Sequence, residues 1–171
     1  SENSIPFINY RVAENIFCKS FSAENLSRSD TAFDASYKSI GVGLKTFTCP
    51  SNASTEKVAE FNSLSRELRN FNGKELALKL AEYRNERIDL AIRLYNINSS
   101  LYHIVARKDN ELVLFETDYD KIDINNISSI KKSSASLQFE DGKIYIVLNT
   151  LKVHFSETSI LQKMHITFKL A

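Results

Sequence analysis

The sequence predicts an α+β fold built as a single domain over residues 1–171. Three observations indicate this class: helical periodicity near the start of the chain, strand-like runs after residue 98, and a length that suits one hydrophobic core. We expect helices packed on a mixed sheet in residues 1–98, followed by antiparallel hairpins in the strand-rich residues 99–171.

Composition narrows the functional classes. The 22 basic and 21 acidic residues give a net charge of +1, so any basic surface has to be assembled by folding. No apolar run approaches the roughly 20 residues that a membrane span needs. No basic-then-apolar leader opens the chain, so we expect a cytoplasmic protein without membrane contact. Cys18 and Cys49 form no Cys-x-x-Cys motif, so we expect reduced thiols and no zinc site.

The first predicted element is a helix over residues 8–22. A spacing of about 100° per residue places four apolar side chains on one stripe: Tyr10, Ala13, Phe17 and Phe21. Glu14 falls on the same stripe, and a buried carboxylate is costly unless it is paired or binds a metal ion. Glu14 is therefore either an edge residue paired with an arginine or a functional group.

Two strands are predicted next, over residues 31–37 and 40–48. The first contains Asp34, and the second contains Lys45 between apolar neighbours. Lysine is rarely buried unless it is paired or has a chemical role. In metal-dependent phosphodiester hydrolysis, a carboxylate holds a divalent cation and a nearby ammonium group helps the attacking water and the charged phosphate.

Helices are predicted around the middle of the chain. Ser54 or Thr55 can cap a helix that runs to about residue 70, with Glu56 and Glu60 beside its apolar stripe. The Asn-Gly pair at residues 72–73 then stops it. A second long helix covers residues 74–96 and carries the charged run 84–87.

The last part of the chain has the alternation of strands. Residues 101–107 and 112–117 bracket a polar turn, and residues 137–139 and 143–148 bracket an Asp-Gly turn that favours a hairpin. We expect two more strands at 153–155 and 165–170 and a polar loop that contains Lys131 and Lys132.

These elements resemble the PD-(D/E)xK superfamily of restriction-endonuclease-like nucleases. The likeness rests on a helix with an inward glutamate, an aspartate on one strand, and the strand Gly41-Val-Gly-Leu-Lys-Thr-Phe47. The resemblance implies that Asp34 binds the metal ion, that Lys45 is the active-site lysine, and that Glu14 lies near the metal. It also implies Mg²⁺ or Mn²⁺ as cofactor, which fits a site built from carboxylates.

The chain departs from the family at Gly43, where an acidic residue usually stands two positions before the lysine. Three explanations stay open. Glu60, or else Glu56, supplies the missing carboxylate from the next helix; the protein has lost catalysis and kept binding; or the strand register is shifted and Asp30 is the ligand.

The function implied by the resemblance is hydrolysis of double-stranded DNA, as in a type II restriction endonuclease. Asp34, Lys45, Glu60 and Glu14 are then the catalytic set, and a palindromic target requires a homodimer. Four basic residues are weaker candidates for DNA contacts: Arg84, Arg87, Lys131 and Lys132. The alternative function is a catalytically inactive DNA-binding or protein-interaction module on the same fold.

Overall fold

The chain was analysed as a computed structural model, which describes residues 5, 7–48, 54–60, 68, 70–133, 136–155 and 159–170. Side chains are not part of that description in residues 54–60, 148–155 and 159–170. The fold is α+β, as predicted, and the chain divides into two compact units. The first unit is Ser1–Asn52 with Arg84–Lys121, and the second is Ala53–Tyr83 with Ile122–Ala171.

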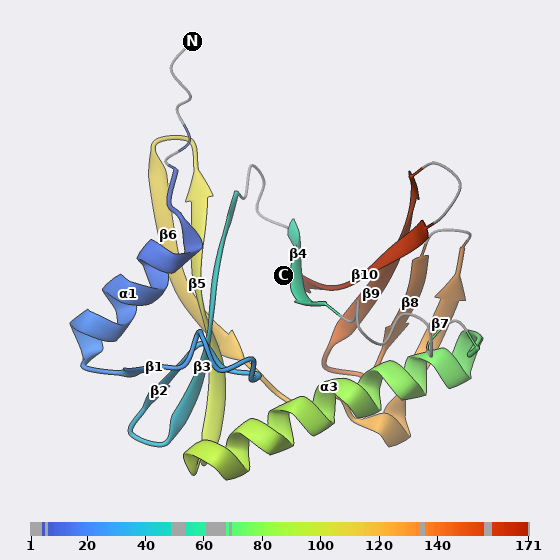
Figure 1. The fold of residues 1–171 in the computed structure, drawn as a ribbon, viewed down its shortest axis with the longest axis horizontal. Coiled ribbons are helices and arrows are strands. Elements are labelled where there is room, and N and C mark those ends of the chain that lie inside the picture. The colour runs from blue at the N-terminus through green and yellow to red at the C-terminus, as the bar shows by residue number, and fades with distance from the viewer. Residues whose placement is uncertain are drawn as a thin grey trace. The chain divides into compact units, whose positions relative to one another are not determined.

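The first unit contains helix α1, the second half of helix α3 and a mixed five-stranded sheet of order β1-β2-β3-β5-β6 (Figure 1). Strands β3 and β5 are parallel, and the other neighbours are antiparallel. The bounds of its elements are α1 Tyr10–Phe21, β1 Glu24–Asn25, β2 Ala35–Tyr37, β3 Ile40–Thr48, α3 Gly73–Tyr95, β5 Ser99–Lys108 and β6 Glu111–Asp118.

Helix α1 forms where the sequence predicts it, with defined ends. The Asn9 side chain caps the start by accepting a hydrogen bond from Arg11 N at 2.9 Å. Ser22 ends the helix in the left-handed conformation with φ 53°. Glu14 and Cys18 are the buried residues of this helix, whereas Tyr10 and Phe21 are about half exposed. The buried stripe is thus narrower than predicted, and the inward direction of Glu14 is confirmed.

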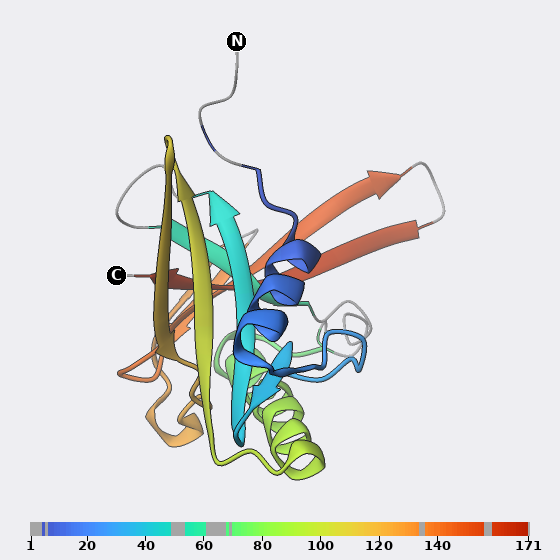
Figure 2. The same cartoon turned by 90° about the vertical axis from the view of Figure 1, so that its left-hand side faces the viewer.

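The two faces of β3 have different neighbours. Val42 and Leu44 pack in a cluster with Cys18 of α1 and Ala35 of β2, and Figure 2 shows α1 lying along this part of the sheet. Side chains alternate along a strand, so Gly43 faces the opposite side. There it lies against the aromatic rings of Tyr102 on β5 and Tyr119, the residue that follows β6.

The second unit contains a five-stranded antiparallel sheet of order β4-β10-β9-β8-β7. Its elements are β4 Ser54–Glu60, the first half of α3, the short helix η1 Ile124–Asn126, β7 Ser128–Lys132, β8 Ser136–Glu140, β9 Tyr145–Phe155 and β10 Ser159–Leu170. None of the helices in the described ranges is long and apolar enough to cross a membrane.

Several predicted boundaries need correction. The helix expected from residue 54 to 70 is wrong over residues 54–60, because this segment is β4 and pairs with β10. Residues 61–67, in the rest of that helix, lie outside the described residues. Lys131 and Lys132 lie on β7, an edge strand, rather than in a loop. The strand expected at 153–155 is the end of β9.

Candidate functional site

Asp34 is fixed in place by main-chain hydrogen bonds on both sides. Its N–H donates to Val42 O at 2.9 Å, and its carbonyl accepts from Leu26 N at 2.9 Å. The first bond continues the pairing of β2 with β3 and the second continues the pairing of β1 with β2, so the Asp34 side chain is presented beside β3. Its position follows from backbone pairing and does not depend on a flexible loop.

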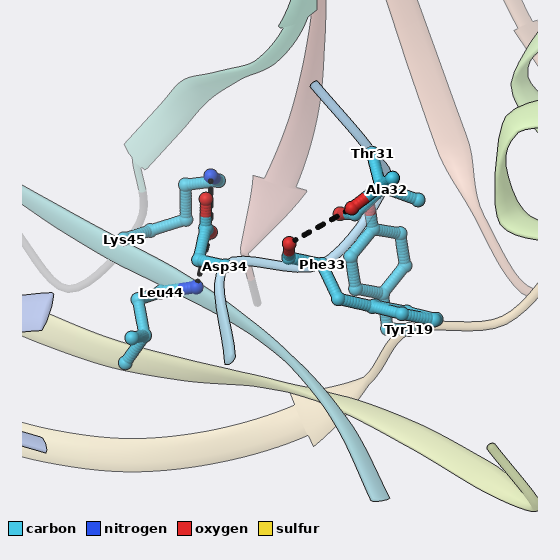
Figure 3. A network of polar contacts seen from close by, with 7 residues as sticks. All are labelled: Thr31, Ala32, Phe33, Asp34, Leu44, Lys45 and Tyr119. Carbon is cyan, nitrogen blue, oxygen red and sulfur yellow. Dashed lines mark hydrogen bonds and ion pairs between the residues drawn. The ribbon is translucent and has the colours of Figure 1, made fainter. Parts of the chain in front are cut away.

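The carboxylate of Asp34 meets Lys45 directly. Asp34 Oδ2 accepts a hydrogen bond from Leu44 N at 2.7 Å and lies 3.3 Å from Lys45 Nζ (Figure 3). The side chains retain 24% and 26% of their exposure, so the pair is half-buried but reachable from solvent. Within the described part of the chain, Asp34 Oδ1 has no hydrogen-bond partner. The predicted proximity of Asp34 and Lys45 is confirmed.

Glu14 belongs to the same electrostatic environment. Its residue is 6% exposed, and burial raises the pKa of its carboxyl group above the ordinary value. The charge of Asp34 raises that pKa further, whereas a hydrogen bond from Ser27 and the charges of Arg11 and Lys45 oppose the rise. Two carboxylates therefore repel each other at this site, which is the condition that a bound cation relieves.

The space around Gly43, the position where the resemblance leads us to expect an acidic residue, is closed by aromatic rings. A Cβ atom at Gly43 would lie 2.7 Å from Cδ1 of Tyr102 and 2.8 Å from Cε1 of Tyr119. These two rings stack with centroids 3.9 Å apart, and both residues are buried. The space that an acidic side chain would need is filled by aromatic carbon, which gives a physical reason for glycine here.

The other proposed carboxylates have different locations. Glu60 and Glu56 lie on β4 of the second unit, and their side chains are outside the described residues. The helix that was expected to carry them does not form there. Asp30 is 95% exposed and pairs with Arg87 at 3.1 Å, whereas Asp34 contacts Lys45. The strand register predicted from the sequence is therefore the observed one.

The basic candidates separate into buried and exposed groups. Arg84 is 4% exposed, donates to Asp120 O at 2.6 Å and lies 5.2 Å from the Tyr119 ring centroid. These contacts give Arg84 a structural role within the first unit. Arg87 is exposed, as are Lys131 and Lys132 on β7, where Lys132 donates to Asn72.

Sequence reasoning missed several residues beside the candidate site. Arg11 stands three positions before Glu14, so helical spacing alone could have indicated that they are neighbours. Nothing in the sequence signals Ser27, because its position depends on a turn held by Asn25. Tyr102 and Tyr119 could not be found either, since their stacking requires the pairing of β5 with β6.

The donor set is compatible with a hard divalent cation. Among the side chains that the structure describes, no three acids, histidines or cysteines form a group that could hold a metal ion. Mg²⁺ nevertheless binds through one or two carboxylates, with waters and substrate phosphate oxygens completing its ligands. Asp34 Oδ1, which has no hydrogen-bond partner in the described part of the chain, can supply one such ligand.

Comparison of the chain with protein-family models, with curated proteins and with solved structures found no match.

Proposed function

We propose that this chain is a metal-dependent endonuclease that hydrolyses phosphodiester bonds of double-stranded DNA, of the type II restriction kind. The observation that carries the proposal is the Asp34–Lys45 contact at 3.3 Å, with Glu14 electrostatically coupled to both residues. An acid and an amine that meet beside β3 of a mixed sheet, with an inward glutamate on the neighbouring helix, are what the superfamily resemblance implies.

Each residue has a distinct part in the proposed reaction. Asp34 and Glu14 would hold Mg²⁺, which when bound supplies Lewis acidity and charge neutralisation to the scissile phosphate. Lys45 orients the attacking water and stabilises the extra negative charge of the transition state. Leu44 N holds Asp34 Oδ2, so the carboxylate is oriented before substrate arrives.

The same proposal includes a cytoplasmic homodimer. A palindromic duplex presents two equivalent scissile phosphates, so a two-fold dimer places one Asp34–Lys45 pair on each strand. The exposed Arg87, Lys131 and Lys132 are proposed to contact the phosphate backbone.

Cleavage of long natural double-stranded DNAs tests the catalytic assignment. We expect cutting with Mg²⁺ or Mn²⁺ and none with EDTA. Asp34→Asn keeps an acceptor for Leu44 N but loses the charge, so the cleavage rate should fall by about a hundredfold or more. Lys45→Met should have a similar effect.

Asp89→Asn is the matched control, because Asp89 forms a surface ion pair with Lys121 at 2.9 Å and lies in the same unit. It should cut at the normal rate. Equal cutting by Asp34→Asn and Asp89→Asn would exclude the assigned site.

The closed environment of Gly43 favours a second function, a catalytically inactive DNA-binding module. It predicts DNA binding with no cleavage in either metal ion. Protein that binds no DNA would instead indicate the protein-interaction form of the module.

A further inference from the structure

A polar pocket lies next to the candidate site. Its volume is about 310 Å³, and it opens between α1 and the turn that follows β1. Six residues line it: Arg11, Glu14, Asn15, Asn25, Ser27 and Arg28. Glu14 is the link, because it lines the pocket and its carboxyl group also interacts with Asp34 and Lys45.

The wall of the pocket is held by its own hydrogen bonds. Asn25 Nδ2 donates to Asn15 Oδ1 at 3.3 Å, which joins the turn to α1. Asn25 Oδ1 accepts from Ser27 N at 3.0 Å and from Ser27 Oγ at 2.6 Å. Leu26, in the same turn, is 3% exposed, and its N–H donates a hydrogen bond to Asp34 O. Both features hold the turn against the sheet. One main-chain bond thus connects the pocket wall to the candidate metal ligand.

The charge of the lining favours an anion. Two guanidinium groups face one carboxylate, and each guanidinium offers five N–H donors. Neither Arg11 nor Arg28 forms an ion pair with an acid in the part of the chain that the structure describes. Arginine pairs in a polar recess match the geometry of phosphate oxygens. The nearby carboxylates of Glu14 and Asp34 would repel a free carboxylate or phosphate ion. The repulsion is offset if a bound cation neutralises it or if the phosphate belongs to a larger ligand that also binds elsewhere.

We propose that this pocket binds a backbone phosphate of the DNA strand that is cut, next to the scissile phosphate, through Arg11 and Arg28. This inference rests on the proposed function for the location of the scissile phosphate. The pocket fixes the register of the strand, so that the reacting phosphate is positioned over Asp34 and Lys45. Glu14 lies between the two proposed phosphate positions, because it lines the pocket and its carboxyl group also interacts with Asp34 and Lys45.

DNA binding measured without cleavage tests this assignment separately from catalysis. Fluorescence anisotropy of labelled duplex DNA in EDTA, at several salt concentrations, compares the unchanged protein with Arg11→Gln, Arg28→Gln and the double variant. Each lost phosphate contact should reduce the slope of log affinity against log salt by about 0.9, and affinity should fall about tenfold. Circular dichroism verifies that the variants are folded.

Lys19→Gln is the matched control, since Lys19 is an exposed cation on α1 outside the pocket lining. A titration with inorganic phosphate separates the two sources of phosphate. Calorimetric binding of low millimolar phosphate to the unchanged protein that is lost in the double variant, while the anisotropy of bound DNA stays the same in both, would assign the pocket to free phosphate and overturn the inference. Equal salt slopes for the double variant and Lys19→Gln would also overturn it.

Catalytic readouts distinguish the two proposals. If Asp34→Asn abolishes cleavage while the double arginine variant keeps normal binding, the pocket inference fails alone. If the double variant loses binding as expected but no form of the protein cuts DNA, the catalytic proposal fails alone.

Discussion

The close approach at Gly43 leads to a quantitative prediction about placing a larger side chain at this position. A Cβ atom there would be 2.7 Å from Tyr102 Cδ1 and 2.8 Å from Tyr119 Cε1. Real Cβ atoms do not approach carbon this closely, so a ring or the strand must move. Tyr119 cannot shift freely, because its hydroxyl donates to Ala32 O at 2.9 Å and its ring also contacts Phe33.

The size of the effect follows from competing terms. Overpacking a well-packed core costs about 1–3 kcal/mol. Replacing glycine by alanine lowers the conformational entropy of the unfolded chain, which stabilises the folded state by only about 0.4–1 kcal/mol. We therefore expect Gly43→Ala to lower the free energy of unfolding by about 1–2 kcal/mol, which corresponds to a Tm lower by about 2–8 °C for a chain of this size. Gly43→Glu adds a buried charge and should destabilise the fold further.

Urea unfolding monitored by circular dichroism measures the stability, and plasmid cleavage measures the function. Thr48→Ala is a control at the exposed end of the same strand and should change stability by no more than about 0.5 kcal/mol. Gly43→Glu should not accelerate cleavage at any metal concentration. A Gly43→Glu variant as stable as the unchanged protein and faster in cleavage would refute the reasoning.

The pH dependence of Glu14 and the contrast between two arginines give further predictions. Burial, and then the charge of Asp34, raise the pKa of the Glu14 carboxyl group above 4.5 in the folded protein. The protonated form of Glu14 is therefore favoured by folding. Its contribution to the free energy of unfolding is fully present below pH 4.5 and is lost as the pH rises through the higher folded pKa. Urea unfolding over a pH series should show the Glu14→Gln variant gaining stability relative to the unchanged protein over that window; parallel curves would contradict the assignment. Arg84→Met should cost about 1–3 kcal/mol in thermal unfolding because the half-buried Asp120 carbonyl loses this donor, whereas Arg87→Gln should cost at most about 1 kcal/mol. Equal losses in both arginine variants would show that the buried contact is not the stronger one.

The parts of the fold that the sequence predicted are those with local signals. Helix α1 has its own cap at Asn9, and β3 was predicted from its own β-branched and aromatic residues without knowledge of its partner strands. The approach of Asp34 to Lys45 was predictable for the same reason, since the two residues are joined by one short antiparallel turn.

The failures concern contacts between distant parts of the chain. Residues 54–60 have a helical cap and stripe, but they pair with residues more than a hundred positions later in β10. That pairing overrides local propensity, which is a weak preference. Arg84 sits in a run that appears polar in the sequence. Arg84 is buried because it contacts Asp120 and Tyr119, which lie far along the chain. The spacing of Arg84 from Glu86 and Asp89 in the sequence gives no indication of those contacts.

The hydrogen bond from Tyr119 to Ala32 spans 87 positions in the sequence and ends two residues before Asp34. The segment from Thr31 to Phe47 would look like a transplantable hairpin if only its own residues were considered. However, the segment is also held by Tyr119, the residue that follows β6, through its hydrogen bond to Ala32 and its ring contact with Phe33. A graft of that segment onto another scaffold would carry Asp34 and Lys45 without the hydrogen bond and ring contact that Tyr119 provides, so we expect the geometry of this candidate site to be lost in a short graft.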